Sequence, residues 1–350
     1  MPSSELSDRE RHILEAVIRS YVETAQPAGS RTISRKYVLG VSPATIRNTM
    51  SDLEEKGFLY HPHTSAGRIP TEKAYRLYVD QLMRVRPLET LERRRLAKDI
   101  TAGGSAIESI LRRAAQSLGI LTQELGVALG PRLDQTMLDR LEIVRLTAEK
   151  LILVLSLRGG SVRTIFIEVP AEIPDDALTE VQAVLNERLG GLSLAEIRTS
   201  LGTRLRDVSS PSAASGATEL LNIFLQEGEQ LFDVTDPDAG ETVVLGQASL
   251  LADKPEFASG ERMRRLIELT ETRTELATLL RSRSSATGVS ITIGREHGDA
   301  LPGGLTVVTA EYQVGTLAGV IGVIGPTRMP YEKVIALVTH TSSLVTELLE

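Results

Sequence analysis

The most informative stretch of this sequence spans residues 42–70 and reads SPATIRNTMSDLEEKGFLYHPHTSAGRIP. Ser42 is a favoured N-cap residue, and Pro43 suits the first helical position because that position needs no backbone N–H donor. The apolar residues that follow at helical spacing are Ile46, Met50 and Leu53. The pattern predicts a helix that begins after Ser42 and packs one face inward.

The opposite face of this helix carries small and mostly uncharged side chains. At about 100° per residue, the residues that point outward or flank that direction are Ala44, Thr45, Arg47, Asn48 and Ser51. Asn48 could pair with adenine through two hydrogen bonds, and Arg47 could bind guanine or a phosphate. A small Ala44 or Thr45 could contact a thymine methyl group, and the helix N-terminus at Ser42 favours a phosphate. We expect this helix to read DNA; the alternative is an ordinary amphipathic surface helix.

A short hairpin is expected directly after this helix. Gly57 ends the helix, a strand follows, and residues 61–68 form a turn-rich loop with Arg68 near its return. Arg68, His61 and His63 are placed to contact phosphates or the minor groove. Two histidines alone offer too few ligands for a metal site, so no metal is expected.

The flanking sequence completes an N-terminal head, residues 1–86. Ser7 and Glu10 form a capping-box pattern before an apolar helix that residues 26–29 end, and a short second helix is expected over 31–37. Three helices followed by a hairpin predict a winged helix-turn-helix, a DNA-binding fold. The head contains 13 Lys/Arg and 10 Asp/Glu in a chain whose net charge is −7, so a mildly basic module precedes an acidic remainder. Such a balance fits local phosphate binding, although chance could also produce it.

Composition excludes several classes of protein. A chain of 350 residues, 41% of them hydrophobic, predicts two or three globular domains,. The absence of cysteine excludes disulfides, thiolate zinc sites and a cysteine nucleophile, and it suits the cytoplasm,. The polar N-terminus is not a signal peptide, and no apolar run approaches the roughly 20 residues that a membrane span needs. We expect a cytoplasmic protein that does not enter a membrane.

The remainder of the chain predicts an α+β fold with an insertion. Residues 87–104 read as a linker or an exposed helix, and an amphipathic helix is expected over 105–126. The later elements are expected as strands at 141–146, 151–157 and 162–169, helices at 177–189, 219–232 and 261–280, strands at 289–293, 305–311 and 316–324, and a helix at 332–349. We therefore expect one domain formed by 105–170 and 241–350, interrupted by a subdomain at 171–240.

Motifs in this remainder give no indication of catalysis. There is no P-loop, no HExxH and no GxGxxG after a strand,, so we expect neither an enzyme nor a bound cofactor. Arg328, before the closing helix, could bind an anion or pair with an acid, and pairing is favoured. Leu221, Phe224 and Leu225 could line a dimer interface or an internal core, and the sequence does not separate these two alternatives.

Three segments resemble the HrcA family of heat-inducible transcription repressors. They are SPATIRNTMSDLEEKGFLYHPHTSAGRIPTEKAYRLYVD at 42–80, PAGSRTIS at 27–34 and GREHGDALPGGLTVVTAEYQVGTLAGVIGVIGPTRMPYEKV at 294–334. The resemblance implies a GAF-like α/β domain that carries an inserted dimerisation domain. It also implies negative regulation from an inverted-repeat operator upstream of groE and dnaK operons, with the GroE chaperonin keeping the repressor active.

A homodimer is also expected from binding energetics. Each base contact contributes about 1–3 kcal/mol, whereas nanomolar affinity needs about 12 kcal/mol, so one head is insufficient. Two heads related by a two-fold axis would bind double-stranded DNA as an inverted repeat. The alternative is a metabolite-responsive winged-helix regulator whose GAF-like body binds a ligand. An enzyme with a winged-helix appendage is disfavoured because the chain lacks a Gly/Arg-rich nucleotide loop.

Overall fold

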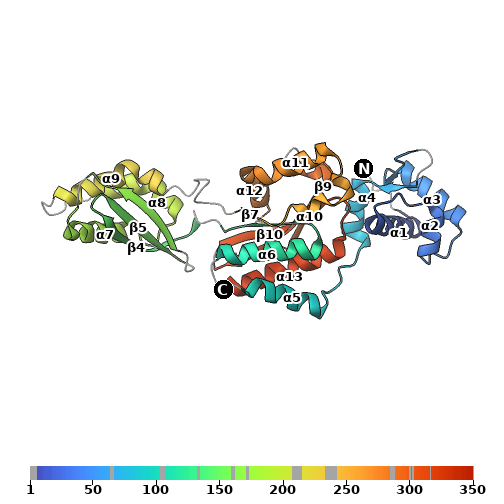
Figure 1. Ribbon diagram of the computed structural model, residues 1–350, viewed down its shortest axis with the longest axis horizontal. Helices are drawn as coiled ribbons and strands as arrows, with labels where there is room; N and C mark the ends of the chain where they lie inside the picture. Colours follow the sequence, from blue (N-terminus) through green and yellow to red (C-terminus); the bar gives the residue numbers. More distant parts are fainter. Residues whose placement is uncertain are drawn as a thin grey trace. The chain divides into compact units, whose positions relative to one another are not determined.

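The computed structural model describes residues 6–63, 67–102, 107–131, 135–158, 162–170, 173–206, 215–232, 243–283, 288–298, 301, 303–315 and 317–349. The chain divides into two compact units. The first comprises Met1–Gly130, Val243–Tyr312 and Val320–Leu349. The second comprises Pro131–Thr242 and Gln313–Gly319, together with Glu350. Both units combine helices with sheets, so the fold is α+β (Figure 1).

The head begins with three helices that share a core. They are α1 (Asp8–Thr24), α2 (Ser30–Lys36) and α3 (Pro43–Glu55). The expected capping box starts α1: the Glu10 carboxylate accepts the Ser7 N–H at 2.8 Å, and the Ser7 hydroxyl accepts the Glu10 N–H. Next come the antiparallel strands β1 (Leu59–Tyr60) and β2 (Ile69–Pro70), helix α4 (Glu72–Leu77) and a π-helical turn, Tyr78–Leu82. Ile33, Ile46 and Leu53 are completely buried.

The rest of the first unit, from residue 87 onward, is the body, and it is built on a five-stranded sheet in the order β7-β3-β10-β9-β8. These strands are β3 (Leu125–Leu129), β7 (Val243–Leu245), β8 (Val289–Ile293), β9 (Leu305–Val314) and β10 (Leu317–Pro326). Gly126 lets a helix approach β3 closely, because a Cβ there would lie 1.8 Å from the Ala115 carbonyl oxygen.

Helices cover both faces of this sheet (Figure 1). One side carries α5 (Thr90–Thr101), α6 (Ile107–Thr122) and α13 (Tyr331–Leu349), which pack against one another. The other side carries α10 (Ser249–Ala252), α11 (Gly260–Glu271) and α12 (Arg273–Arg281). Two 3₁₀ turns, Pro255–Phe257 and Gly294–His297, join these elements.

The second unit packs three helices on one face of a three-stranded antiparallel sheet. Its strands are β4 (Leu138–Thr147), β5 (Lys150–Leu157) and β6 (Val162–Glu168), and its helices are α7 (Asp175–Leu189), α8 (Leu194–Arg206) and α9 (Ser215–Leu231). Leu141, Leu153 and Ile167 of the sheet are buried with Val181 and Leu201 of the helices in one core. Among the described residues of this unit, no element covers the other face of the sheet.

The structure divides the chain at a different place from the one expected. The sequence assigns the strands between 138 and 168 to the domain at 105–170, whereas the structure groups them with α7–α9, because their inward-facing leucines share a core with those helices. The insertion thus spans Pro131–Thr242 rather than 171–240. Leu221 and Phe224 also belong to this core, whereas Leu225 is 37% exposed.

Two smaller differences concern the body. The linker expected at 87–104 contains α5, whose Leu96 and Ile100 are completely buried and which packs on α6. The helix expected over 105–126 ends at Thr122, and β3 begins at Leu125. Among the described residues, no helix combines the length and apolarity required to cross a lipid bilayer.

Candidate nucleic-acid interface

Helix α3 starts as its sequence predicts. The Ser42 hydroxyl accepts the Thr45 N–H at 3.1 Å, and the two hydroxyl oxygens lie 3.0 Å apart. Ile46, Met50 and Leu53 are at most 3% exposed, which confirms the inward face. The hydroxyls of Ser42 and Thr45 are thus engaged with each other and stabilise the start of the helix.

The N-terminal half of α3 presents an exposed and nearly uncharged surface. Ala44, Arg47, Asn48 and Ser51 are exposed, whereas Thr45 is half-buried. Arg47 is the only charged residue between positions 43 and 51. Within the described part of the chain, the Asn48 amide has no hydrogen-bond partner. Its two donors and its acceptor are therefore available to the edge of a base.

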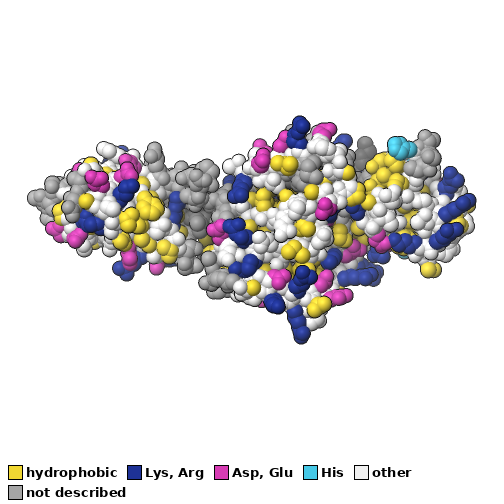
Figure 2. Space-filling model, viewed as in Figure 1, with side chains coloured by type: hydrophobic (Ala, Val, Ile, Leu, Met, Phe, Trp, Pro, Cys, Tyr) yellow, Lys and Arg dark blue, Asp and Glu magenta, His cyan; other side chains and the backbone are white. Residues whose placement is uncertain are grey.

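Cations without a carboxylate partner gather on α2 and α3. Arg31 and Arg35 of α2 and Arg47 of α3 are exposed. The ion pairs recorded for the described residues of the head involve other cations, such as Lys36 and Lys56. Figure 2 shows Lys and Arg side chains gathered over this end of the head. Phosphates are attracted most strongly by cations that no neighbouring acid neutralises, so this surface suits a duplex backbone.

Arg68 lies in a different environment from the one expected. Its guanidinium forms an ion pair with Glu54 of α3 at 2.8 Å, and its side chain is only 15% exposed. His61 approaches the same carboxylate, with its Nδ1 2.5 Å from Glu54 Oε1. The Arg68 backbone also pairs with Ala28 through hydrogen bonds of 2.8 and 2.9 Å. Arg68 thus fastens the hairpin to α3 instead of reaching outward, and Glu54 is the partner that the sequence analysis missed.

The rest of the hairpin is anchored at its base. His63 is exposed as expected, and residues 64–66 lie outside the described residues. Gly67 is required by a close approach, because a Cβ there would lie 2.5 Å from the carbonyl carbon and oxygen of Ala28. His63 is accordingly the one side chain proposed for this loop that the structure leaves open to solvent among those it describes.

An arginine of α4 joins the head to the body. Arg76 donates to both carboxylate oxygens of Glu296, at 2.8 and 2.5 Å, and to the Ile291 carbonyl at 2.8 Å. Burial raises the pKa of Glu296, but hydrogen bonds from Arg76 and from the Ile293 N–H outweigh it and hold the pKa below its usual value. Glu296 is therefore ionised at neutral pH, and the contact is a charged one.

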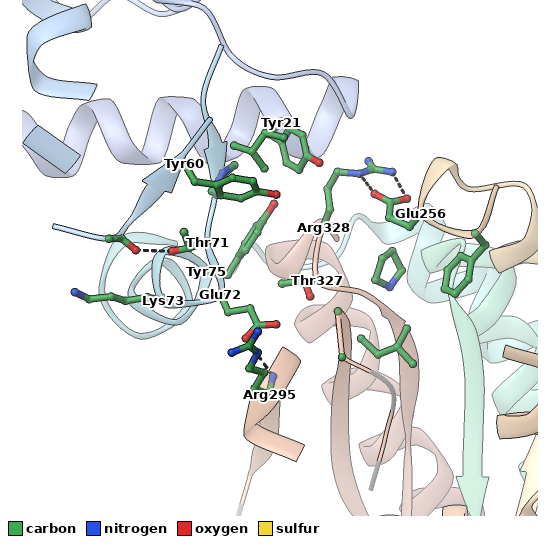
Figure 3. Close-up of a pocket in the computed structure, with 18 residues that line it drawn as sticks. Tyr21, Tyr60, Thr71, Glu72, Lys73, Tyr75, Glu256, Arg295, Thr327 and Arg328 are labelled. Carbon is green, nitrogen blue, oxygen red and sulfur yellow. Dashed lines mark hydrogen bonds and ion pairs between the residues drawn. The ribbon is translucent and has the colours of Figure 1, made fainter. Parts of the chain in front are cut away.

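Arg328 makes a second connection between the head and the body. Its guanidinium forms an ion pair with Glu256 at 2.5 Å (Figure 3) and donates to the Val22 carbonyl of α1 at 2.8 Å. The expected pairing of Arg328 with an acid is thus confirmed. Arg328 thus links α1 to the 3₁₀ turn at Pro255–Phe257.

Comparisons with known proteins identify the family. The family model described as HrcA protein C terminal domain matches residues 108–335. The heat-inducible transcription repressor HrcA of Chlorobium limicola is 40% identical over 97% of this chain and 96% of its own length. The protein of the same name from Geobacter sulfurreducens is 38% identical over 99% of both chains. A crystal structure of a protein described only as hypothetical matches with a TM-score of 0.62 at 22% identity over 99% of both chains, which supports the fold alone. The chain belongs to the HrcA family of heat-inducible transcription repressors.

Proposed function

We propose that this protein represses chaperone operons of the groE and dnaK type by binding an inverted-repeat operator. Membership in a family of heat-inducible transcription repressors supports repression rather than catalysis. The observation that carries the proposal is the surface of α3, where Arg47 and Asn48 are exposed and have no partner among the described residues. Arg31 and Arg35 of α2, which have no ion-pair partner in the part of the chain that the structure describes, lie on the same part of the head.

The head has the element order of a winged helix-turn-helix, with α1–α3 followed by the β1–β2 hairpin. In that arrangement α3 enters the major groove and the preceding helix crosses the backbone. Asn48 then reads adenine and Arg47 reads guanine or binds a phosphate. The short side chains of Ala44 and Ser51 allow the helix to approach the bases closely.

The remaining proposed DNA-binding residues act in two ways. Exposed His63 contacts the backbone or the minor groove from the hairpin. Ser42, Thr45 and Arg68 act through the structure of the head: the first two hold the start of α3, and Arg68 holds the hairpin against α3. Their replacement would displace the contacts of other residues.

The uncovered sheet face of the second unit offers a surface for a homodimer. Val144, Ile152 and Phe166 form one row across β4, β5 and β6, on the side opposite the helices. Val144 and Phe166 are 46% and 65% exposed, and hydrophobic side chains are visible over this unit (Figure 2). Apolar residues that recur on one sheet face are normally buried. We therefore place the dimer interface on this face of β4–β6 and not on α9.

The body is proposed to be GAF-like, and the GroE chaperonin is proposed to keep the repressor active in the cytoplasm. The chaperonin proposal follows from what the resemblance to the HrcA family implies. The five-stranded sheet with helices on both faces is the feature that supports the GAF-like fold. Titration of operator complexes with purified chaperonin tests the partner directly: operator occupancy should rise with added GroE.

The central test is a gel shift with an inverted-repeat duplex. Asn48→Ala should weaken operator binding at least tenfold, because each half-site loses a contact of about 1–3 kcal/mol. It should also relax the base preference at one position of each half-site. Asn222→Ala is the matched control, because Asn222 is an exposed helical asparagine in the second unit. Full affinity and full base preference in the Asn48 variant would show that α3 is not the reading helix.

A further inference from the structure

A cavity of about 770 Å³ lies between the head and the body within the first unit. The head contributes residues of α1, of the β1–β2 hairpin and of α4, and the body contributes the turns around residues 256, 295, 304 and 327 (Figure 3). Small-molecule sites in proteins commonly measure about 300–1,000 Å³ and lie between domains. This cavity therefore has the size and the position of a ligand site.

Aromatic side chains form much of its wall. Tyr21, Tyr60, Tyr75 and Phe257 line the cavity. Figure 3 shows Tyr21, Tyr60 and Tyr75 gathered on the head side, with Arg328 and Thr327 facing them from the body. Tyr60 remains 45% exposed although it is large and partly apolar. A planar ring placed here would contact aromatic surfaces on the head and on the body at once.

Two hydroxyl groups in this wall lack hydrogen-bond partners among the described residues. The Tyr75 hydroxyl is buried and unpartnered, and Tyr75 as a whole is 2% exposed, with its ring 5.9 Å from that of Tyr331. The Thr327 hydroxyl, on the opposite wall, is also buried and unpartnered. Buried polar groups are almost always hydrogen-bonded in proteins. Both hydroxyls can donate to an acceptor that occupies the cavity.

The charged side chains of the lining indicate the sign of that acceptor. Glu256 is neutralised by its ion pair with Arg328. Glu72 accepts the backbone N–H of Arg295, while the Arg295 guanidinium and the Lys73 ammonium have no carboxylate partner among the described residues. The Lys73 ammonium donates to the Lys56 carbonyl at 2.8 Å and points away from the cavity in Figure 3. The Arg295 guanidinium is therefore the cation that remains available to an anionic ligand.

We propose that this cavity binds a small aromatic monoanion. Its ring lies among Tyr21, Tyr60 and Tyr75, and its anionic group lies within reach of Arg295. Because the walls come from the head and from the body, occupancy is coupled to the position of the head, and through it to operator affinity. This coupling rests on the proposed DNA-binding function, whereas the binding itself does not.

Calorimetric titration of the full chain with 2-naphthoate, benzoate and indole-3-acetate tests the site. At least one of these acids should bind saturably with a Kd of about 1 mM or tighter, and the uncharged 2-naphthamide should bind at least tenfold more weakly than 2-naphthoate. Tyr75→Phe removes only the hydroxyl and should weaken binding about three- to tenfold. Arg295→Gln should weaken it further and erase the preference for the acid over the amide.

Tyr37→Phe is the matched control, because the Tyr37 hydroxyl is also buried and unpartnered but does not line this cavity. The proposal is overturned if none of the three acids binds saturably, if the amide binds equally well, or if the control weakens binding as much as Tyr75→Phe. A gel shift with and without the bound acid tests the coupling, and an unchanged operator affinity would refute it. Failure of operator binding itself would refute the proposed function and leave the calorimetric result standing.

Discussion

Replacing Glu124 by glutamine should make the protein more stable at neutral and alkaline pH. Glu124 directly precedes β3 and is completely buried, and its Oε1 lies 2.5 Å from Lys254 Nζ. Burial raises the pKa of Glu124 from 4.5 to about 7, and the attraction of Lys254 and Arg328 lowers it only part of the way back. The carboxyl group is thus protonated far above its usual range.

The size and sign of the effect follow from this pKa. A rise from 4.5 to about 7 corresponds to about 3 kcal/mol, at about 1.4 kcal/mol per unit. Because the pKa is raised in the folded state, the carboxyl contributes fully to stability below pH 4.5. Its contribution is lost as the pH rises through about 7,. Glutamine has nearly the same shape and does not titrate. The stability of a Glu124→Gln variant therefore does not fall in this way as the pH rises.

Urea unfolding of both proteins at several pH values between about 4.5 and 8 measures the effect. The free energy of unfolding of the variant, minus that of the wild type, should rise by about 3 kcal/mol across this range. Carboxyl groups with a lowered pKa, such as Glu10 and Glu296, make both proteins less stable at acid pH. Their effect is the same in the variant and the wild type, so it cancels in the difference. Glu219→Gln, at an exposed position of α9, is the control and should give a flat difference. A flat or falling difference for Glu124→Gln would refute the reasoning.

Four further substitutions separate the roles of the surfaces. Arg31→Ala and Arg35→Ala should each weaken binding to all duplexes alike and reduce the salt slope of binding by about 1; a slope that does not change in a salt titration would remove α2 from the interface. Phe166→Ser should raise the monomer fraction in sedimentation experiments, because it removes the most exposed apolar side chain of the proposed dimer face,; a dimer of unchanged strength would place the interface elsewhere. Arg68→Ala should lower the free energy of unfolding by about 1–2 kcal/mol, since its pair with Glu54 is partly buried,, and should leave the salt slope unchanged; a lower slope would show that Arg68 contacts phosphate after all.

Helix α3 could be predicted from sequence because its signals are local. The cap at Ser42 and the buried positions Ile46, Met50 and Leu53 lie within four turns of one another, and the structure confirms them. The outward direction of Asn48 follows from the same helical geometry. A feature that depends on neighbours three or four residues away needs no knowledge of the tertiary structure.

Strand β3 could not be predicted because it has no local signal of this kind. Leu125–Leu129 is buried at every position, so it shows no alternation of apolar and polar residues and continues the apolar pattern of α6. Its partners are β10 and β7, which are remote in the sequence. The boundary of the insertion depends in the same way on which distant helices cover β4–β6. Neither the position of β3 nor the boundary of the insertion produces a repeating apolar pattern in the nearby sequence.

The junction between the head and the body was equally inaccessible to sequence reasoning. Arg76 and Glu296 are separated by 220 positions. The cavity tyrosines Tyr21, Tyr60 and Tyr75 come from three different elements, α1, β1 and α4. The position of Arg68 was missed because Glu54 looks like a solvated acid at the end of a helix. Each arginine could pair with many acids that are distant in the sequence, and only the folded structure shows which pair forms.

The free energy of the contacts across this junction is small enough for the binding of a ligand to overcome. The charged and polar links made by Arg76, Arg328 and Tyr78 contribute about 1 kcal/mol each after desolvation. Packing of Tyr75 on Tyr331 also stabilises the junction. Because a cavity lies beside Tyr75, the apolar packing between the head and the body is incomplete. Moving a two-state equilibrium from 1:99 to 99:1 needs about 5.5 kcal/mol of differential affinity. A ligand or protein partner that contacts the head and the body together could supply that amount, so the junction is the place where the position of α3 can be controlled without any change to α3 itself.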